Sequence, residues 1–122
     1  MRIIKLLSVI ASVSLLAACT PTKTEGVVSV VDAVTNSPIG LSKVKFTVDD
    51  PTRPDAGFFL CYKSSLTEEY EVTTNLAGVT DKICFTLPAV LKVDVVTPDG
   101  KTGTTTLALV EGETETVTCK VN

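Results

Sequence analysis

The chain of 122 residues contains no His, no Trp and only two Tyr. The missing His removes the commonest general base and the commonest metal ligand. The shortage of aromatic side chains argues against stacking platforms for sugars or single-stranded nucleic acid. Ser and Thr are plentiful, but no base is paired with any of them, and no carboxylate pair can be assigned to a cleft. We therefore expect a protein that is not an enzyme, uses no small-molecule cofactor, and works by binding or scaffolding.

Basic charge is also scarce, with 11 Lys and Arg against 14 Asp and Glu. The basic residues form no stripe along the chain, and two of them, Arg2 and Lys5, fall in the leading segment described next. A mildly acidic chain of this kind is a poor candidate for nucleic acid or for direct attraction to anionic lipid. Nucleic-acid binding is therefore excluded from the expected functions.

Residues 1–18 have the three parts of a secretory signal peptide: a positive start, an apolar run over 6–16, and small residues at the end. The apolar run is too short to span a membrane, which takes about 20 residues. A polar run follows it over 20–25. We predict that 1–18 is a cleaved signal peptide.

The segment ends in Leu16-Ala17-Ala18-Cys19, which resembles the lipobox of bacterial lipoproteins. The resemblance implies cleavage before Cys19 and a diacylglyceryl group on its thiol, so that the acylated residue binds the lipid bilayer. Acyl chains contribute about 0.8 kcal/mol per buried CH₂, which makes such an anchor essentially permanent. Thr20, in place of an Asp, implies sorting to the outer membrane, and we expect the domain on its periplasmic face. The alternative is an ordinary signal peptide with Cys19 free or disulfide-bonded.

Residues 19–25 form a short tether, and the rest of the chain, 26–122, has the composition of one domain. Short alternations of apolar and polar residues recur there, separated by turn signals, as in 44–48, 91–95 and 117–121. This pattern predicts an all-β fold, a single seven-stranded antiparallel Greek-key β-sandwich. The expected strands cover 26–32, 43–48, 69–74, 79–87, 90–97, 102–109 and 114–121.

Two turns and one insertion complete this outline. The Pro-Asp-Gly turn in 97–101 predicts a hairpin between the strands on either side. The Glu-Gly-Glu turn at 111–113 predicts a second hairpin, onto 114–121. The insertion 49–67 does not fit a plain meander and predicts a loop followed by a short apolar strand or lid over one end of the sandwich.

The series Val30 to Ile39, then the strand 44–48, then Thr73-Thr74-Asn75-Leu76-Ala77-Gly78 and a Pro88-led strand, resembles the carboxypeptidase regulatory-like or transthyretin-like sandwich. Bacterial Ig-like repeats of adhesins share a similar series. The resemblance covers most of 26–122 but consists of turn and core residues, so it implies a fold and no catalytic or ligand-binding residue.

Three cysteines remain in the expected domain. Export to an oxidising compartment predicts one disulfide and one spare thiol. Cys84 falls on the polar face of the expected strand 79–87, whereas Cys119 shares the inward face of Val117. We therefore favour a Cys61–Cys84 disulfide with Cys119 buried, while pairings of Cys119 with either of the others stay open.

Phe58 and Phe59 are the candidate partner-binding residues. Because they are adjacent, a strand turns one inward and the other outward. The outward side chain is a candidate apolar anchor for a partner protein. Packing on the outer sheet face, or contact with bilayer headgroups, is the alternative.

Two acidic clusters have simpler explanations. Asp49, Asp50 and Asp55 lack the alternate spacing of calcium loops and are interrupted by prolines, so no metal site is expected. The acidic run in 68–71 is either a docking face or a solvated strand edge that discourages aggregation. We favour the second.

Together these features predict a small outer-membrane lipoprotein whose sandwich is a non-catalytic, membrane-proximal binding or scaffolding module. The expected partner is another envelope protein. The alternative is a surface-exposed adhesin or a carrier of a small ligand.

Overall fold

The computed structural model describes residues 23–50, 52 and 56–122. The predicted signal peptide and lipobox, including Leu16, Ala17, Ala18 and Cys19, lie outside the described residues. The described chain is built from strands, with no helix among them: β1 (Thr24–Asp32), β2 (Lys43–Val48), β3 (Tyr70–Thr73), β4 (Ile83–Phe85), β5 (Val90–Val96), β6 (Thr102–Ala108) and β7 (Thr114–Val121).

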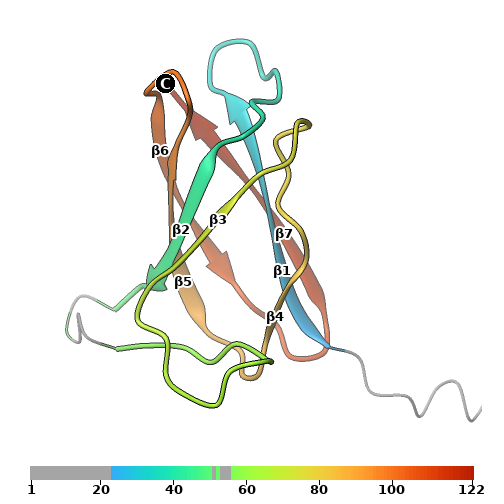
Figure 1. The fold of residues 1–122 in the computed structure, drawn as a ribbon, viewed down its shortest axis with the longest axis vertical. Coiled ribbons are helices and arrows are strands. Elements are labelled where there is room, and N and C mark those ends of the chain that lie inside the picture. Colours follow the sequence, from blue (N-terminus) through green and yellow to red (C-terminus); the bar gives the residue numbers. More distant parts are fainter. Residues whose placement is uncertain (1–22, 51, 53–55) are drawn as a thin grey trace, which may run out of the picture.

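The seven strands form two sheets that face each other, one in the order β4-β1-β7 and the other in the order β3-β2-β5-β6 (Figure 1). This confirms the predicted all-β sandwich, and the architecture is compatible with an Ig-like fold. The chain crosses from one sheet to the other after β1, β3, β4 and β6. The hairpin between β5 and β6 forms as the Pro-Asp-Gly turn predicts.

One ladder is parallel, contrary to the prediction of a purely antiparallel sandwich. β1 and β7 run side by side in the same direction over eight residue pairs, from Glu25 and Thr114 to Asp32 and Val121. The predicted hairpin between β6 and β7 is also wrong, because the turn at 111–113 carries the chain into the other sheet. A Glu-Gly-Glu turn signals that the chain reverses, but not which sheet the next strand joins.

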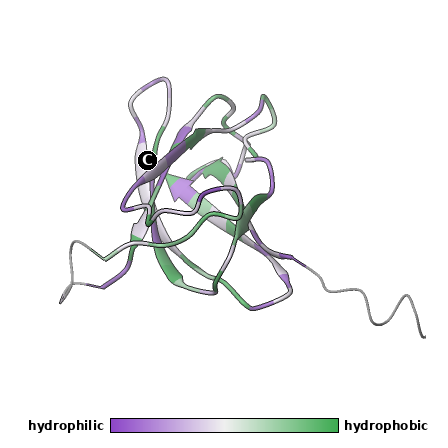
Figure 2. Ribbon diagram, turned by 60° about the horizontal axis from the view of Figure 1, so that its bottom comes forward, coloured by the Kyte–Doolittle hydropathy of each residue, from purple (hydrophilic) through white to green (hydrophobic). Residues whose placement is uncertain are grey.

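The core lies between the sheets and is filled by alternate residues of the strands. Val28 and Val30 of β1 face Val44 and Phe46 of β2, and all four are fully buried. Hydrophobic residues accordingly mark the strands around the centre of the domain (Figure 2). Burying a Val, Leu or Phe side chain contributes about 1.5–3 kcal/mol, so this alternation is the main source of the fold's stability.

The two sides of the sandwich differ. On one side the edge strands β6 and β7 approach closely: Thr102 and Asn122 each donate a backbone hydrogen bond to the other, at 3.2 and 3.1 Å. Gly103 is required there, because a Cβ would overlap the carbonyl oxygen of Lys120. On the other side the edge strands are β3 and β4, and no ladder joins them. That side of the sandwich is open.

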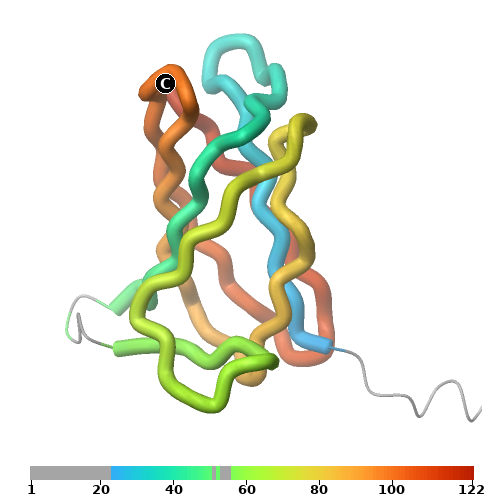
Figure 3. The backbone as a smooth tube through the Cα atoms, viewed as in Figure 1, coloured from blue at the N-terminus to red at the C-terminus, as the bar shows by residue number. Residues whose placement is uncertain are grey.

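The two ends of the sandwich also differ (Figure 3). β1 begins at the end over which the insertion lies, and the C-terminus lies at the opposite end with the turns 33–41 and 74–78. The described part of the insertion is tied down by two isolated bridges, Phe58 to Thr67 and Leu60 to Phe85. The chain therefore enters the domain beside the insertion.

Candidate functional site

A hollow of about 420 Å³ lies on the open side of the sandwich, between β3 and β4. We call it the β3–β4 groove and define it by its lining residues: Lys23, Glu25, Tyr62, Tyr70, Val72, Thr73, Asp81, Lys82, Ile83 and Cys84. Apart from Thr73, the side chains are of two kinds, an apolar and aromatic group and a charged group with two residues of each sign. The groove can thus accept a chain segment with both apolar and polar parts.

Both tyrosines of the protein line this groove. Their hydroxyl groups share a hydrogen bond with an oxygen–oxygen distance of 2.8 Å. Tyr70 is half-buried and its ring stacks near Phe46 of the core, whereas Tyr62 is 64% exposed. The hydrogen bond with Tyr62 and partial burial together raise the pKa of Tyr70 to about 12. Tyr is enriched at protein interfaces because it combines a large apolar ring with a polar tip.

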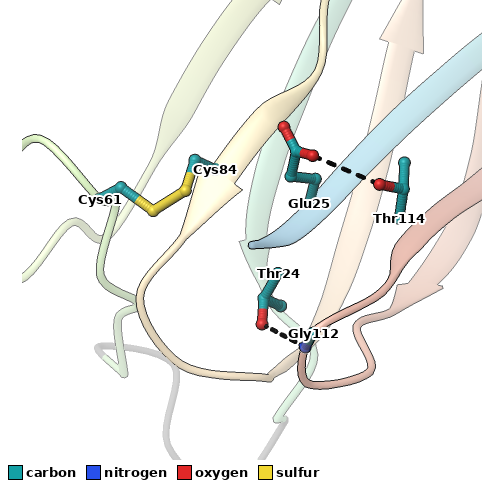
Figure 4. The surroundings of a disulfide bond; sticks show 6 residues. All are labelled: Thr24, Glu25, Cys61, Cys84, Gly112 and Thr114. Carbon is teal, nitrogen blue, oxygen red and sulfur yellow. Dashed lines mark hydrogen bonds between the residues drawn. A yellow bond between two sulfur atoms is a disulfide. The ribbon is translucent and has the colours of Figure 1, made fainter. Parts of the chain in front are cut away.

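The groove is lined in part by Cys84, which forms a disulfide with Cys61 of the insertion (Figure 4). The two Cα atoms lie 5.4 Å apart, and this is the pairing that the alternation of strand 79–87 favours over those of Cys119. Cys61 N–H also donates to the Cys84 carbonyl at 3.0 Å, and Thr86 N–H to the Phe59 carbonyl at 2.9 Å. The insertion thus runs along the outer edge of β4, and Tyr62 follows directly, at the rim of the groove.

The start of β1 is held on its other flank by the turn between β6 and β7 (Figure 4). Gly112 N–H donates to the hydroxyl of Thr24 at 2.9 Å, and the hydroxyl of Thr114 donates to the carboxylate of Glu25 at 3.3 Å. Glu25 N–H donates to the Glu113 carbonyl at 3.0 Å. The point where the chain enters the domain is therefore fixed next to the groove.

Cys119 lies away from the groove. It is a free cysteine, fully buried between the sheets, as the inward face of strand 114–121 predicts. Burial raises the pKa of its thiol, and the carboxylate of Asp94 adds to this. A buried, protonated thiol is a poor nucleophile. Cys119 is therefore a core residue of the sandwich.

The two phenylalanines of the insertion separate as adjacent strand residues should. Phe58 is only 3% exposed and packs against Phe85, with ring centres 5.9 Å apart. Phe59 is half-exposed. Only Phe59 therefore faces the surroundings, and Phe58 belongs to the core.

The acidic clusters hold no evident metal site. Among the described residues, no group of three or more Cys, Asp or Glu side chains is placed to bind a metal ion. Asp49 and Asp50 are described, whereas Asp55 of the same cluster lies outside the described residues. β3 begins at Tyr70, within the acidic run 68–71, and is an edge strand. None of the described residues forms a helix long and apolar enough to cross a membrane.

Asp32, at the end of β1, has a structural role at the far end of the sandwich. Its carboxylate accepts hydrogen bonds from the backbone N–H groups of Val34 and Thr35, at 2.8 and 3.1 Å, and from the Lys101 ammonium. These contacts lower the pKa of Asp32 to about 2, and the hydrogen bond with Lys101 contributes most. The charged carboxylate thus fixes the turn after β1 and ties it to the β5–β6 hairpin.

Sequence reasoning missed the tyrosine pair and the groove around it. One signal was available: Tyr62 follows Cys61, so a disulfide to Cys84 brings it to β4. What the sequence pattern does not show is that β3 and β4 leave a gap, because this depends on how the sheets are joined.

No protein-family model matches the chain, and no curated protein matches it.

Proposed function

We propose that this protein is an outer-membrane lipoprotein whose sandwich is a non-catalytic, membrane-proximal binding or scaffolding module. The observation that carries the proposal is the Leu16-Ala17-Ala18-Cys19 motif at the end of an apolar run, only four residues before Lys23. At up to ~3.5 Å per residue, the chain places Lys23 within about 14 Å of Cys19. An acylated Cys19 would therefore keep the β3–β4 groove close to the bilayer.

The groove supports binding over catalysis. It contains exposed aromatic and apolar side chains beside charges of both signs, as protein interfaces do. Its tyrosines are held by the disulfide and by packing on the core, so a partner would meet a preformed surface. Another envelope protein is the partner that fits this location.

The strand order bears on the two fold families that the sequence resembles. The first two strands of an immunoglobulin constant domain share one sheet. Here β1 and β2 lie in different sheets. This difference from the constant-type immunoglobulin order supports the transthyretin-like alternative, which we propose for the domain.

The lipid anchor is tested by expressing the chain in a Gram-negative host with a labelled fatty acid. We expect labelling of the wild-type protein, accumulation of an uncleaved precursor in the presence of globomycin, and recovery in the outer-membrane fraction. Cys19→Ala should abolish the labelling, whereas Cys119→Ala should leave it unchanged. A wild-type protein that is unlabelled or released as a soluble product contradicts the proposal.

The binding role is tested by photo-crosslinking in intact cells. A photoreactive residue replaces Tyr62 in the groove, and the matched control replaces Leu76, which is 83% exposed at the opposite end. We expect one dominant envelope protein to be crosslinked from position 62 and not from position 76. If no protein is crosslinked from position 62 or from position 76, the result would contradict a scaffolding role.

A carrier of a small ligand is the second candidate, and the volume of the groove favours it. Ligand pockets have volumes of about 300–1,000 Å³, a range that includes this hollow. A groove with an exposed Tyr at its rim encloses a ligand poorly, so we rank this role second. Native mass spectrometry of the purified protein distinguishes the two, since a carrier retains a small molecule.

A further inference from the structure

The outer edge of β3 offers unpaired backbone groups to the groove. Thr74 N–H donates to the carbonyl of Ser42 at 2.9 Å. Hydrogen-bonded and non-hydrogen-bonded pairs alternate along an antiparallel ladder, so Val72 also directs its backbone groups toward β2. The intervening residues, Glu71 and Thr73, direct their N–H and C=O groups outward. No strand of the described chain pairs with that edge.

The two faces of β3 differ in chemistry. Tyr70 and Val72 are half-buried and line the groove. Glu71 and Thr73 are exposed on the other face, and Thr73 also contributes to the rim of the groove. Glu69, immediately before β3, is exposed as well. A strand added to β3 would therefore meet an apolar and aromatic surface on one face and carboxylates on the other.

We propose that the outer edge of β3 binds an extended segment of a partner protein, by strand addition, in which apolar side chains alternate with Lys or Arg. The apolar side chains would enter the β3–β4 groove, and the basic ones would lie opposite Glu69 and Glu71. Backbone hydrogen bonds at Glu71 and Thr73 give affinity, and the alternating side chains give specificity. This inference rests on the proposed role as a binding module and names the chemistry of its partner.

Charge decides between the possible occupants. The charged residues lining the groove, Lys23, Glu25, Asp81 and Lys82, balance in sign. On the other face, the charges next to an added strand are those of Glu69 and Glu71, and Lys45 lies one strand further away, opposite Glu71 on β2. A second copy pairing through the same edge would place like carboxylates near each other, which is unfavourable. A basic and apolar segment avoids this repulsion.

The test uses a short acetylated and amidated peptide of alternating Val and Lys as the probe. Two control peptides contain alternating Val and Glu, or the same Val and Lys residues in separate blocks. The protein is isotope-labelled, disulfide-bonded and purified from whichever cell fraction carries it, and backbone amide shifts and hydrogen exchange are followed by NMR. We expect the first peptide alone to shift the amides of β3 and to slow exchange at Glu71 and Thr73.

Two Thr→Pro variants provide a matched pair. Thr73→Pro removes an outward N–H on the β3 edge without removing a bond to β2. Thr106→Pro does the same on the β6 edge, since Leu109 N–H donates to the Ala89 carbonyl and Thr106 lies out of phase with that pair. We expect Thr73→Pro to weaken peptide binding at least about tenfold and Thr106→Pro to leave it unchanged.

A charge variant tests the second part of the proposal. Glu71→Gln should weaken binding of the Val and Lys peptide by up to about fivefold, as expected for loss of one cross-strand charge pair. It should also make binding less dependent on salt. Amide dispersion in the spectrum of each variant reports that the fold is retained.

Several outcomes would overturn the proposal: binding of all three peptides alike, shifts confined to β6 or to the far end, equal loss in both Pro variants, or absence of binding. Sedimentation that detects dimers through β3 would favour a second copy and would also overturn it. Because the peptide test does not depend on a lipid, its failure is distinguishable from failure of the proposed function. A lipoprotein that crosslinks a partner from position 62 but ignores the peptide retains the function and loses this inference.

Discussion

Loss of the Cys61–Cys84 disulfide should cost about 3.4 kcal/mol of unfolding free energy. The two cysteines are 23 residues apart in sequence, and closing a loop of that length in the unfolded chain gives this value on the chain-entropy model. The cavity cost of replacing both residues by Ala should be small, because Cys61 is exposed and Cys84 is half-exposed. The neighbouring Leu60 and Phe58 keep their places in the core.

Urea unfolding of the oxidised protein and of the Cys61→Ala/Cys84→Ala double variant measures this difference. For a domain of this size, 3.4 kcal/mol lowers the melting temperature by roughly 15–25 °C. It lowers the urea midpoint by roughly 1–3 M. Reductant should produce the same loss in the wild type and none in the double variant, while Cys119→Ala should respond to reductant as the wild type does.

A loss below about 1 kcal/mol would refute the reasoning, because the model assigns most of the effect to the unfolded chain. Loss of the response to reductant in Cys119→Ala would refute the pairing itself, because that variant retains both Cys61 and Cys84. Hydrogen exchange adds a local test. In the double variant, amides of the 56–62 segment should exchange faster than they do in the wild type. The increase should be larger than for amides of β1.

Three further predictions concern single residues. Phe58→Ala should destabilise the domain by about 3–5 kcal/mol in urea unfolding, whereas Phe59→Ala, at a half-exposed site, should cost much less; similar values for both would contradict the inward placement of Phe58. Gly103→Ala should cost about 1–3 kcal/mol, because its Cβ overlaps the Lys120 carbonyl oxygen, and a neutral result would show that β6 and β7 can separate freely. The pKa of Asp32 is lowered from 3.8 to about 2 on folding, so its contribution to stability is present above about pH 4 and lost as the pH falls toward 2. Asp32→Asn should therefore flatten the stability profile across that interval, and a profile that is unchanged in the variant would contradict the assignment.

Much of the fold follows from period-two alternation. β2 and β7 occupy the predicted residues 43–48 and 114–121, because apolar residues alternate with polar ones throughout β2 and from Val117 onward in β7. β4 is shorter than the predicted strand 79–87, since only Val79 and then Ile83 onward pair with β1. The exposed residues Asp81 and Lys82 lie between these two points.

Alternation of apolar and polar residues predicts neither the direction in which two strands pair nor the groove. A strand buried on one face has the same pattern whether its neighbour is parallel or antiparallel, so β7 beside β1 could not be foreseen. Tyr70 and Val72 show the alternation of any half-buried strand, and nothing local states that β3 lies at an edge. The opposite faces of Cys84 and Cys119 favour the Cys61–Cys84 disulfide, but they do not exclude a pairing of Cys119.

The parallel ladder between β1 and β7 bears on how the domain would withstand mechanical load. β1 is the central strand of its sheet, flanked by β4 and β7, and the chain toward Cys19 leaves directly from its first residue. A pull on that chain directed along the axis of β1 would strain the hydrogen bonds of both ladders together, in shear. A strand peeled from a sheet edge loses its bonds one at a time. A module tethered at one end and pulled by its partner at another site would thus transmit tension through the strand best placed to resist it.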